Sequence, residues 1–169
     1  MLIMVSGGSA SGKSAYAEGL IAGSNCQNRV YLATMRVWDA ESEERVARHR
    51  AMRADKGFAT VETPFADSPV DLPPASAVLL EDLPNLAANE FFGPGGPDGA
   101  EGRILAFLDR LISAAELLVV VTGELYSDGV DYDAETAAYL ALLASLSCAL
   151  ASRADAVWEV VCGIPVRHK

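Results

Sequence analysis

The sequence is poor in the residues from which proteins build disulfide frameworks and metal cages. It has three cysteines and two histidines among 169 residues. Cys26, Cys148 and Cys162 show neither the spacing of metal ligands nor that of a disulfide framework. We therefore expect three buried thiols in a reducing compartment.

Long apolar runs are also missing. Hydrophobic residues make up 51% of the chain, which predicts a globular protein, but runs such as Leu117 to Val121 are far too short to cross a bilayer. Met1 leads directly into a predicted strand, without the basic stretch of a secretory signal. These features predict a cytoplasmic protein without a membrane span.

Basic residues are scarce as well, because the chain has 13 basic and 23 acidic residues and a net charge of −10. This balance argues against a general nucleic-acid surface. The exception is a basic cluster within twelve positions, formed by Arg45, Arg48, Arg50, Arg53 and Lys56. A local cluster in an acidic protein indicates a site for one anionic ligand.

A phosphate-binding loop follows the first apolar run. Residues 7–14 fit the pattern G-x-x-x-x-G-K-[ST], between a predicted strand at 2–5 and a predicted helix at 15–21. Lys13 is expected to reach the β- and γ-phosphates as a catalytic residue, and the Ser14 hydroxyl is expected to bind Mg²⁺. The nucleotide-binding residues predicted from this loop are Gly7, Gly8, Ser9, Ala10, Ser11, Gly12, Lys13 and Ser14.

Beyond this loop, predicted strands alternate with predicted helices. Strands are expected at 29–34, 58–63, 77–82, 117–122 and 157–162, and helices at 41–55, 84–91, 100–115 and 134–152. This order predicts one P-loop NTPase-like domain over residues 1–169, an α/β fold with a doubly wound, mostly parallel sheet and helices on both faces. Residues 163–166 are expected to add a short C-terminal edge strand that tolerates Pro165.

Glu81 is the predicted partner of the phosphate loop. It follows the apolar run Val78-Leu79-Leu80, and ligands of such sheets bind at the carboxyl ends of the strands. A carboxylate there can hold Mg²⁺ beside the phosphates of a nucleotide. The plainer alternative, for Glu81 and more so for Asp82, is an ordinary polar strand end.

His49 allows two interpretations. Helical spacing places Arg45 and Arg53 on its face, and two guanidiniums would keep the imidazole neutral and nucleophilic while binding phosphate oxygens. The alternative is a solvated basic helix face, in which Glu41–Arg45 and Glu44–Arg48 form ion pairs at i, i+4.

Several segments together resemble the bifunctional adenosylcobinamide kinase / adenosylcobinamide-phosphate guanylyltransferase family of cobalamin biosynthesis, over nearly the whole chain. The matching segments are residues 7–14, Tyr31-Leu32-Ala33-Thr34, Arg45-Val46-Ala47-Arg48-His49-Arg50, Leu79-Leu80-Glu81, Ala154-Asp155-Ala156-Val157 and Gly163-Ile164-Pro165-Val166, in that order.

The resemblance implies two reactions. A nucleoside triphosphate, ATP or GTP, would phosphorylate the aminopropanol hydroxyl of adenosylcobinamide, and GTP would then transfer GMP to that phosphate through a GMP–histidine intermediate on His49. It also implies a trimer with substrate clefts between subunits. Further nucleotide-contacting positions implied by the resemblance are Ala33, Thr34, Met35, Arg50, Ala51, Met52, Arg53, Glu62 and Glu81.

The chain departs from the family pattern after the strand that ends at Thr122. Residues 123–131 keep only Glu124 and Val130 in register, and Tyr139 and Ser147 stand where the family often has Phe and Asn. Because these positions bear on the corrinoid end, two alternatives stay open. One is a P-loop kinase or NTPase for another small hydroxyl substrate, and the other is a nucleotide-binding module without turnover.

Overall fold

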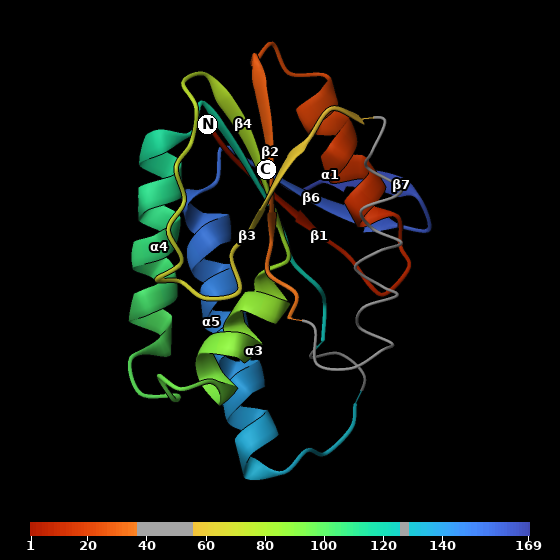
Figure 1. The fold of residues 1–169 in the computed structure, drawn as a ribbon. Helices are drawn as coiled ribbons and strands as arrows, with labels where there is room; N and C mark the ends of the chain where they lie inside the picture. Colours follow the sequence, from red (N-terminus) through yellow and green to blue (C-terminus); the bar gives the residue numbers. More distant parts are fainter. Residues whose placement is uncertain (37–55, 126–128) are drawn as a thin grey trace.

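The computed structural model describes residues 1–36, 56–125 and 129–169 (Figure 1). Its centre is a seven-stranded sheet in the order β3-β2-β4-β5-β1-β6-β7. Every described pairing is parallel except that of β6 with β7. The strands are β1 (Leu2–Ser6), β2 (Asn28–Ala33), β3 (Ala59–Glu62), β4 (Ser76–Glu81), β5 (Leu117–Val121), β6 (Ala156–Val161) and β7 (Ile164–Arg167).

Helices cover both faces of this sheet, which confirms the predicted doubly wound α/β architecture (Figure 1). Helix α1 (Lys13–Ala22) lies on one face, and α3 (Leu83–Phe92), α4 (Ala100–Ala114) and α5 (Ala134–Arg153) lie on the other. The helix predicted at 41–55 lies outside the described residues. The predicted C-terminal edge strand is confirmed as β7, which pairs antiparallel with β6.

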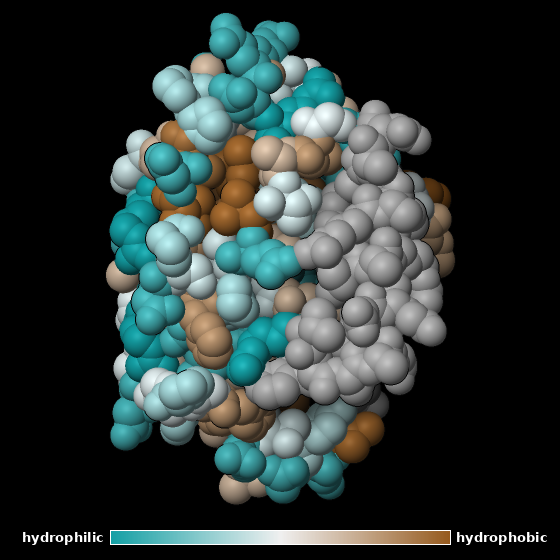
Figure 2. Space-filling model, viewed as in Figure 1, coloured by the Kyte–Doolittle hydropathy of each residue, from teal (hydrophilic) through white to brown (hydrophobic). Residues whose placement is uncertain are grey.

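Two hydrophobic layers explain why the central strands are apolar throughout. Along β5, Leu118 and Val120 pack towards α3, α4 and α5, whereas Val119 and Val121 pack towards α1. A strand that is covered on both faces cannot alternate between apolar and polar side chains. Figure 2 shows hydrophilic side chains along the outer side of α4 and a hydrophobic area between α4 and α1 in the upper half of the view.

Helix α5 contributes a stripe to the core in which Leu143, Leu146 and Leu150 are fully buried, as predicted from their spacing. Asp133 caps its N-terminus by accepting from the backbone N–H of Thr136. By length and composition α5 is the one described helix that could cross a membrane. A single such helix is weak support for a span, because core helices of soluble proteins have the same character.

The expectation of three buried thiols is wrong. Cys148 and Cys162 are exposed and Cys26 is partly exposed. Cys148 lies two positions from the buried Leu146 and Leu150, so helical geometry turns it to the outer face of α5. Cys162 lies in the turn between β6 and β7.

The parallel strands bring their carboxyl ends to one edge of the sheet. Ala33 at the end of β2 pairs with Glu62 on β3 and with Glu81 on β4. Thr122 follows β5, and the phosphate loop follows β1 at the same edge. The predicted site residues within the described ranges are therefore gathered at one edge.

Candidate functional site

The phosphate loop wraps tightly between β1 and α1. A Cβ atom on Gly7 would lie 2.6 Å from Ser11 Oγ and 2.6 Å from the Val160 carbonyl oxygen, so only glycine fits there. Gly12, at φ 94°, directs the chain into α1. The backbone N–H of Gly163 donates to Ser11 O at 2.8 Å, and the turn between β6 and β7 thereby supports the outer side of the loop.

Three kinds of donor lie at the phosphate loop. No side chain caps the N-terminus of α1 in the described residues, so the first N–H groups of the helix are available to an anion. The Lys13 ammonium donates to Gly8 O at 3.0 Å and lies over the loop. Ser11 Oγ is buried and has no hydrogen-bond partner within the described part of the chain. These groups can donate to phosphate oxygens.

Glu81 reaches the phosphate loop from β4. Ser14 Oγ donates to Glu81 Oε1 at 2.5 Å. Strand β5 lies between β1 and β4, so the acidic strand is not the direct neighbour of the strand that carries the loop. The carboxylate nevertheless meets the last residue of the phosphate-loop pattern.

The environment of Glu81 opposes its charge. The pKa of this carboxyl is raised from 4.5 to about 7, chiefly by burial and also by the nearby carboxylates of Asp82 and Glu18. The hydrogen bond from Ser14 and the charge of Lys13 act in the opposite direction without cancelling the rise. A second positive charge at this point would therefore be strongly favourable.

The residues at this point fit Mg²⁺. Glu81 Oε2 is buried and has no hydrogen-bond partner among the described residues, while Ser14 supplies a hydroxyl oxygen. Mg²⁺ prefers oxygen ligands and is commonly held by one or two protein groups together with substrate phosphates. No group of three His, Cys, Asp or Glu side chains that could hold a metal occurs in residues 1–36, 56–125 and 129–169, and such a shared site needs none.

Thr34 and Asp82 have structural tasks at the same edge. The Thr34 side chain is buried, and its Oγ1 lies 3.0 Å from Glu81 O and accepts from Asp82 N at 2.8 Å. Asp82 Oδ1 accepts from Asn85 N at 2.9 Å and caps α3. The interpretation of Asp82 as an ordinary polar strand end therefore has a physical basis, because its carboxylate caps a helix.

The remaining predicted residues divide into two groups. Ala33 and Met35 are partly buried beside Thr34, and Glu62 is exposed at the end of β3, so these positions share the edge with the phosphate loop. The others lie outside the described residues, namely Arg45, Arg48, His49, Arg50, Ala51, Met52 and Arg53. Their roles remain predictions.

Sequence reasoning missed two features. Asn89 of α3 is buried and donates to Thr34 O and Pro64 O, both at 2.8 Å, and no short motif marks an asparagine in this position. The cap at Asp82 had a local signal, because Pro84 lies in the first turn of α3, where proline is favoured.

A pocket of about 230 Å³ lies beyond the end of β5. It is lined by Glu124, Leu125, Tyr132, Thr136, Tyr139 and Leu140. The Tyr139 hydroxyl donates to Pro84 O at 3.0 Å, which connects the wall of this pocket to the start of α3. The pocket falls in the segment where the sequence departs from the family pattern.

The site combines a phosphate loop, the N-terminus of α1 and the Glu81 carboxylate that accepts from Ser14. This combination defines a P-loop nucleotide-binding protein of the α/β class. A sequence model of the family described as cobinamide kinase / cobinamide phosphate guanyltransferase matches residues 3–168. Because this match covers almost the whole chain, the protein belongs to that family.

Two relatives match over the full length of both chains. One is the bifunctional adenosylcobalamin biosynthesis protein CobU of Escherichia coli (strain K12), with 33% identity over 184 residues. The other is the protein of the same name from Salmonella typhimurium, with 31% identity over 183 residues. The resemblance seen in the sequence is thereby confirmed.

A solved structure supports the fold alone. An ATPase from the type III secretion system of pathogenic bacteria matches 94% of this chain and 50% of its own, with a TM-score of 0.54 and 13% identity. KaiC-like protein PH0186 from Pyrococcus horikoshii gives a TM-score of 0.49 at 14% identity.

Proposed function

We propose that residues 1–169 form one nucleotide-binding domain that converts adenosylcobinamide to adenosylcobinamide-GDP in two steps at the phosphate loop. The observation that carries this proposal is the contact of Ser14, the last residue of the phosphate-loop pattern, with the buried carboxylate of Glu81 at the end of β4. Membership of the cobinamide kinase / cobinamide phosphate guanyltransferase family supports the choice of substrate.

In the first step, the aminopropanol hydroxyl of adenosylcobinamide attacks the γ-phosphorus of a nucleoside triphosphate. The bond from the γ-phosphorus to the β-phosphate oxygen breaks, the diphosphate leaves and the hydroxyl proton is released. Lys13 and the N-terminal N–H groups of α1 stabilise the charge on the phosphate oxygens. Mg²⁺ held at Ser14 and Glu81 would neutralise charge that is shared by the β- and γ-phosphates.

In the second step, a ring nitrogen of His49 attacks the α-phosphorus of GTP and pyrophosphate leaves. A phosphate oxygen of adenosylcobinamide phosphate then attacks the phosphorus of the GMP–histidine, which frees His49 and forms the diphosphate of the product. Arg50 and Arg53, close to His49 in the sequence, would bind the oxygens of the phosphate under attack.

The pocket beyond β5 supports an acceptor site at the same edge of the sheet as the phosphate loop. Its lining combines the rings of Tyr132 and Tyr139 with the Glu124 carboxylate and the Thr136 hydroxyl. Apolar walls with a few polar groups suit an organic ligand. We place an arm of the corrinoid here, because the pocket is too small for a whole macrocycle.

Assembly as a homotrimer is the proposed quaternary state, on the basis of the family resemblance. Exposed Val161, Ile164 and Val166 on the terminal hairpin are compatible with a covered surface in an oligomer. Light scattering after size-exclusion chromatography gives the mass directly, and a monomeric mass across concentrations would rule the trimer out.

The test of the proposed function follows both products. The protein is incubated with adenosylcobinamide, Mg²⁺ and either ATP or GTP, and the corrinoids are separated and weighed by mass spectrometry. We expect phosphorylated corrinoid from a triphosphate and the GDP-linked product only with GTP. The variant His49→Ala should retain the kinase step and lose the transfer. A wild-type protein that hydrolyses GTP without modifying the corrinoid would contradict the proposal.

A further inference from the structure

Asn89 connects two strand ends at the site. It lies on α3, is 9% exposed, and its Nδ2 donates to Thr34 O and Pro64 O, both at 2.8 Å. Thr34 directly follows β2, and Pro64 lies two residues beyond the end of β3. One amide group thus fixes the spacing between the two segments that leave these neighbouring strands.

Thr34 extends this connection to the acidic strand. Its backbone N–H donates to Glu81 O at 3.2 Å, and its Oγ1 lies 3.0 Å from the same oxygen. Its Oγ1 also accepts from Asp82 N at 2.8 Å. The backbone of Glu81 is therefore fixed from one side by Thr34, while its carboxylate accepts from Ser14 on the other side.

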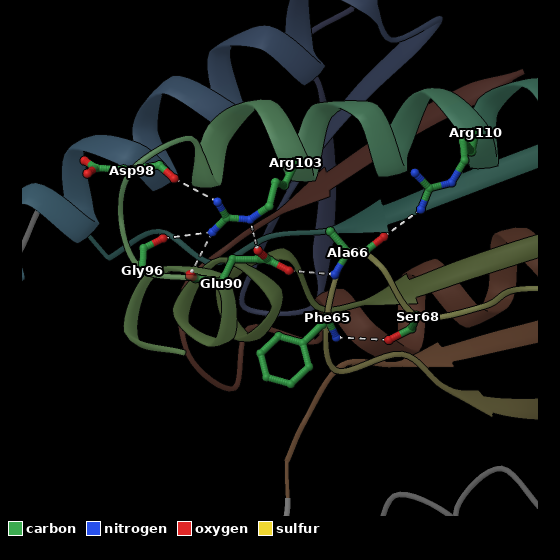
Figure 3. A network of polar contacts seen from close by, with 8 residues as sticks. All are labelled: Phe65, Ala66, Ser68, Glu90, Gly96, Asp98, Arg103 and Arg110. Carbon is green, nitrogen blue, oxygen red and sulfur yellow. Dashed lines mark hydrogen bonds and ion pairs between the residues drawn. The ribbon is translucent and has the colours of Figure 1, made fainter. Parts of the chain in front are cut away.

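The helix that carries Asn89 is itself held firmly. Figure 3 shows Arg103 of α4 between the Glu90 carboxylate and the loop carbonyls of Gly96 and Asp98. Arg103 Nε donates to Glu90 Oε2 at 2.5 Å, and Glu90 Oε1 accepts from Ala66 N at 2.8 Å. Glu90, the residue next to Asn89, therefore anchors α3 to α4 and to the loop after β3. These contacts hold the Asn89 side chain in a defined position.

We propose that Asn89 is a positioning residue for the nucleotide site. By holding Thr34 it keeps the backbone of Glu81 where the carboxylate faces Ser14, so that Mg²⁺-dependent nucleotide binding requires the Asn89 amide. This inference rests on the proposed function only in so far as the phosphate loop binds a nucleotide with Mg²⁺. It is independent of the corrinoid and of His49.

The test compares two variants with a matched control. Asn89→Leu removes the amide at similar size, and Asn89→Ala removes it with a smaller side chain should leucine prevent folding. The control is Arg110→Ala, since Arg110 Nη2 donates to Ala66 O at 2.6 Å and holds the same loop from α4 without touching Thr34 (Figure 3). Titration calorimetry gives the dissociation constant for GTP with Mg²⁺ and with EDTA, and thermal unfolding gives the stability of each protein.

We expect the gain in GTP affinity from Mg²⁺ to fall by about 10- to 100-fold in the Asn89 variants, as is usual when a residue that orients a metal ligand is lost. Binding with EDTA should change little, because the phosphate loop itself is intact. Arg110→Ala should keep the full gain in GTP affinity from Mg²⁺, even if its unfolding temperature falls as much as those of the Asn89 variants.

Three results would overturn this role for Asn89. These are an unchanged Mg²⁺ gain in the Asn89 variants, an equal loss of that gain in Arg110→Ala, and a wild-type protein without any Mg²⁺ gain. Failure of the proposed function would give a different result. If the wild-type protein binds GTP with Mg²⁺ but transfers no GMP, the proposed transferase reaction is refuted and the role of Asn89 is not.

Discussion

Replacing Glu81 by glutamine should stabilise the free protein above neutral pH while it weakens nucleotide binding. The pKa of Glu81 is raised from 4.5 to about 7, chiefly by burial. This difference of about 2.5 pKa units, at about 1.4 kcal/mol for each unit, corresponds to about 3–4 kcal/mol. Glutamine keeps the size of the side chain and removes the charge that burial opposes.

The sign follows from proton linkage. The folded protein binds the Glu81 proton more tightly than the unfolded chain does, so the stability contributed by this group is fully present below pH 4.5 and is lost as the pH rises through about 7. The free energy of unfolding of the Glu81→Gln variant, minus that of the wild type, should therefore increase by about 3 kcal/mol between pH 4.5 and pH 8. Taking the difference between the two proteins cancels the titration of the groups that do not interact with Glu81.

Urea unfolding at several pH values, without nucleotide and with EDTA, measures this difference. Ser14→Ala provides an opposite control, because it removes the hydrogen bond that favours the Glu81 carboxylate and should make the loss of stability with pH larger and extend it to higher pH. A difference between Glu81→Gln and wild type that stays flat from pH 4.5 to pH 8 would refute the reasoning. The same variant should also lose Mg²⁺-dependent GTP binding.

Three further predictions concern single substitutions. Lys13→Met should lower kcat/KM for the triphosphate at least about 100-fold in steady-state assays, because it removes a charge at the phosphates; a smaller change would show that Lys13 does not act there. Asp82→Ala should lower the free energy of unfolding by about 1 kcal/mol through loss of the α3 cap, and unchanged urea unfolding would contradict that assignment. Leu146→Ala should cost about 2–5 kcal/mol in the same measurement because this side chain is fully buried, whereas a cost near zero would place it outside the core.

The sequence allowed much of the fold to be predicted because its strong signals are local. Apolar runs such as Leu117 to Val121 gave the strands, and the spacing of Leu143, Leu146 and Leu150 gave the buried stripe of α5. Strand order had no such signal, because pairing depends on crossovers between distant segments. The position of β5 between β1 and β4 therefore emerged only from the structure.

The site was predictable to the same extent. The phosphate-loop pattern and the acid after an apolar strand identified Ser14 and Glu81, which the structure brings into contact. The raised pKa of Glu81 could not be predicted, because it depends on burial by several elements. The role of Asn89 could not be predicted either, because its two acceptors are backbone carbonyls 55 and 25 positions away in the chain.

The proposed transfer of GMP requires a covalent GMP adduct at His49, which lies outside the described residues. The direct measurement is mass spectrometry of the intact protein and its peptides after incubation with GTP and Mg²⁺, without corrinoid. We predict one added GMP, located on His49, absent from Lys13→Met and released when adenosylcobinamide phosphate is supplied. GTP binding without any such adduct would contradict transfer through a histidine.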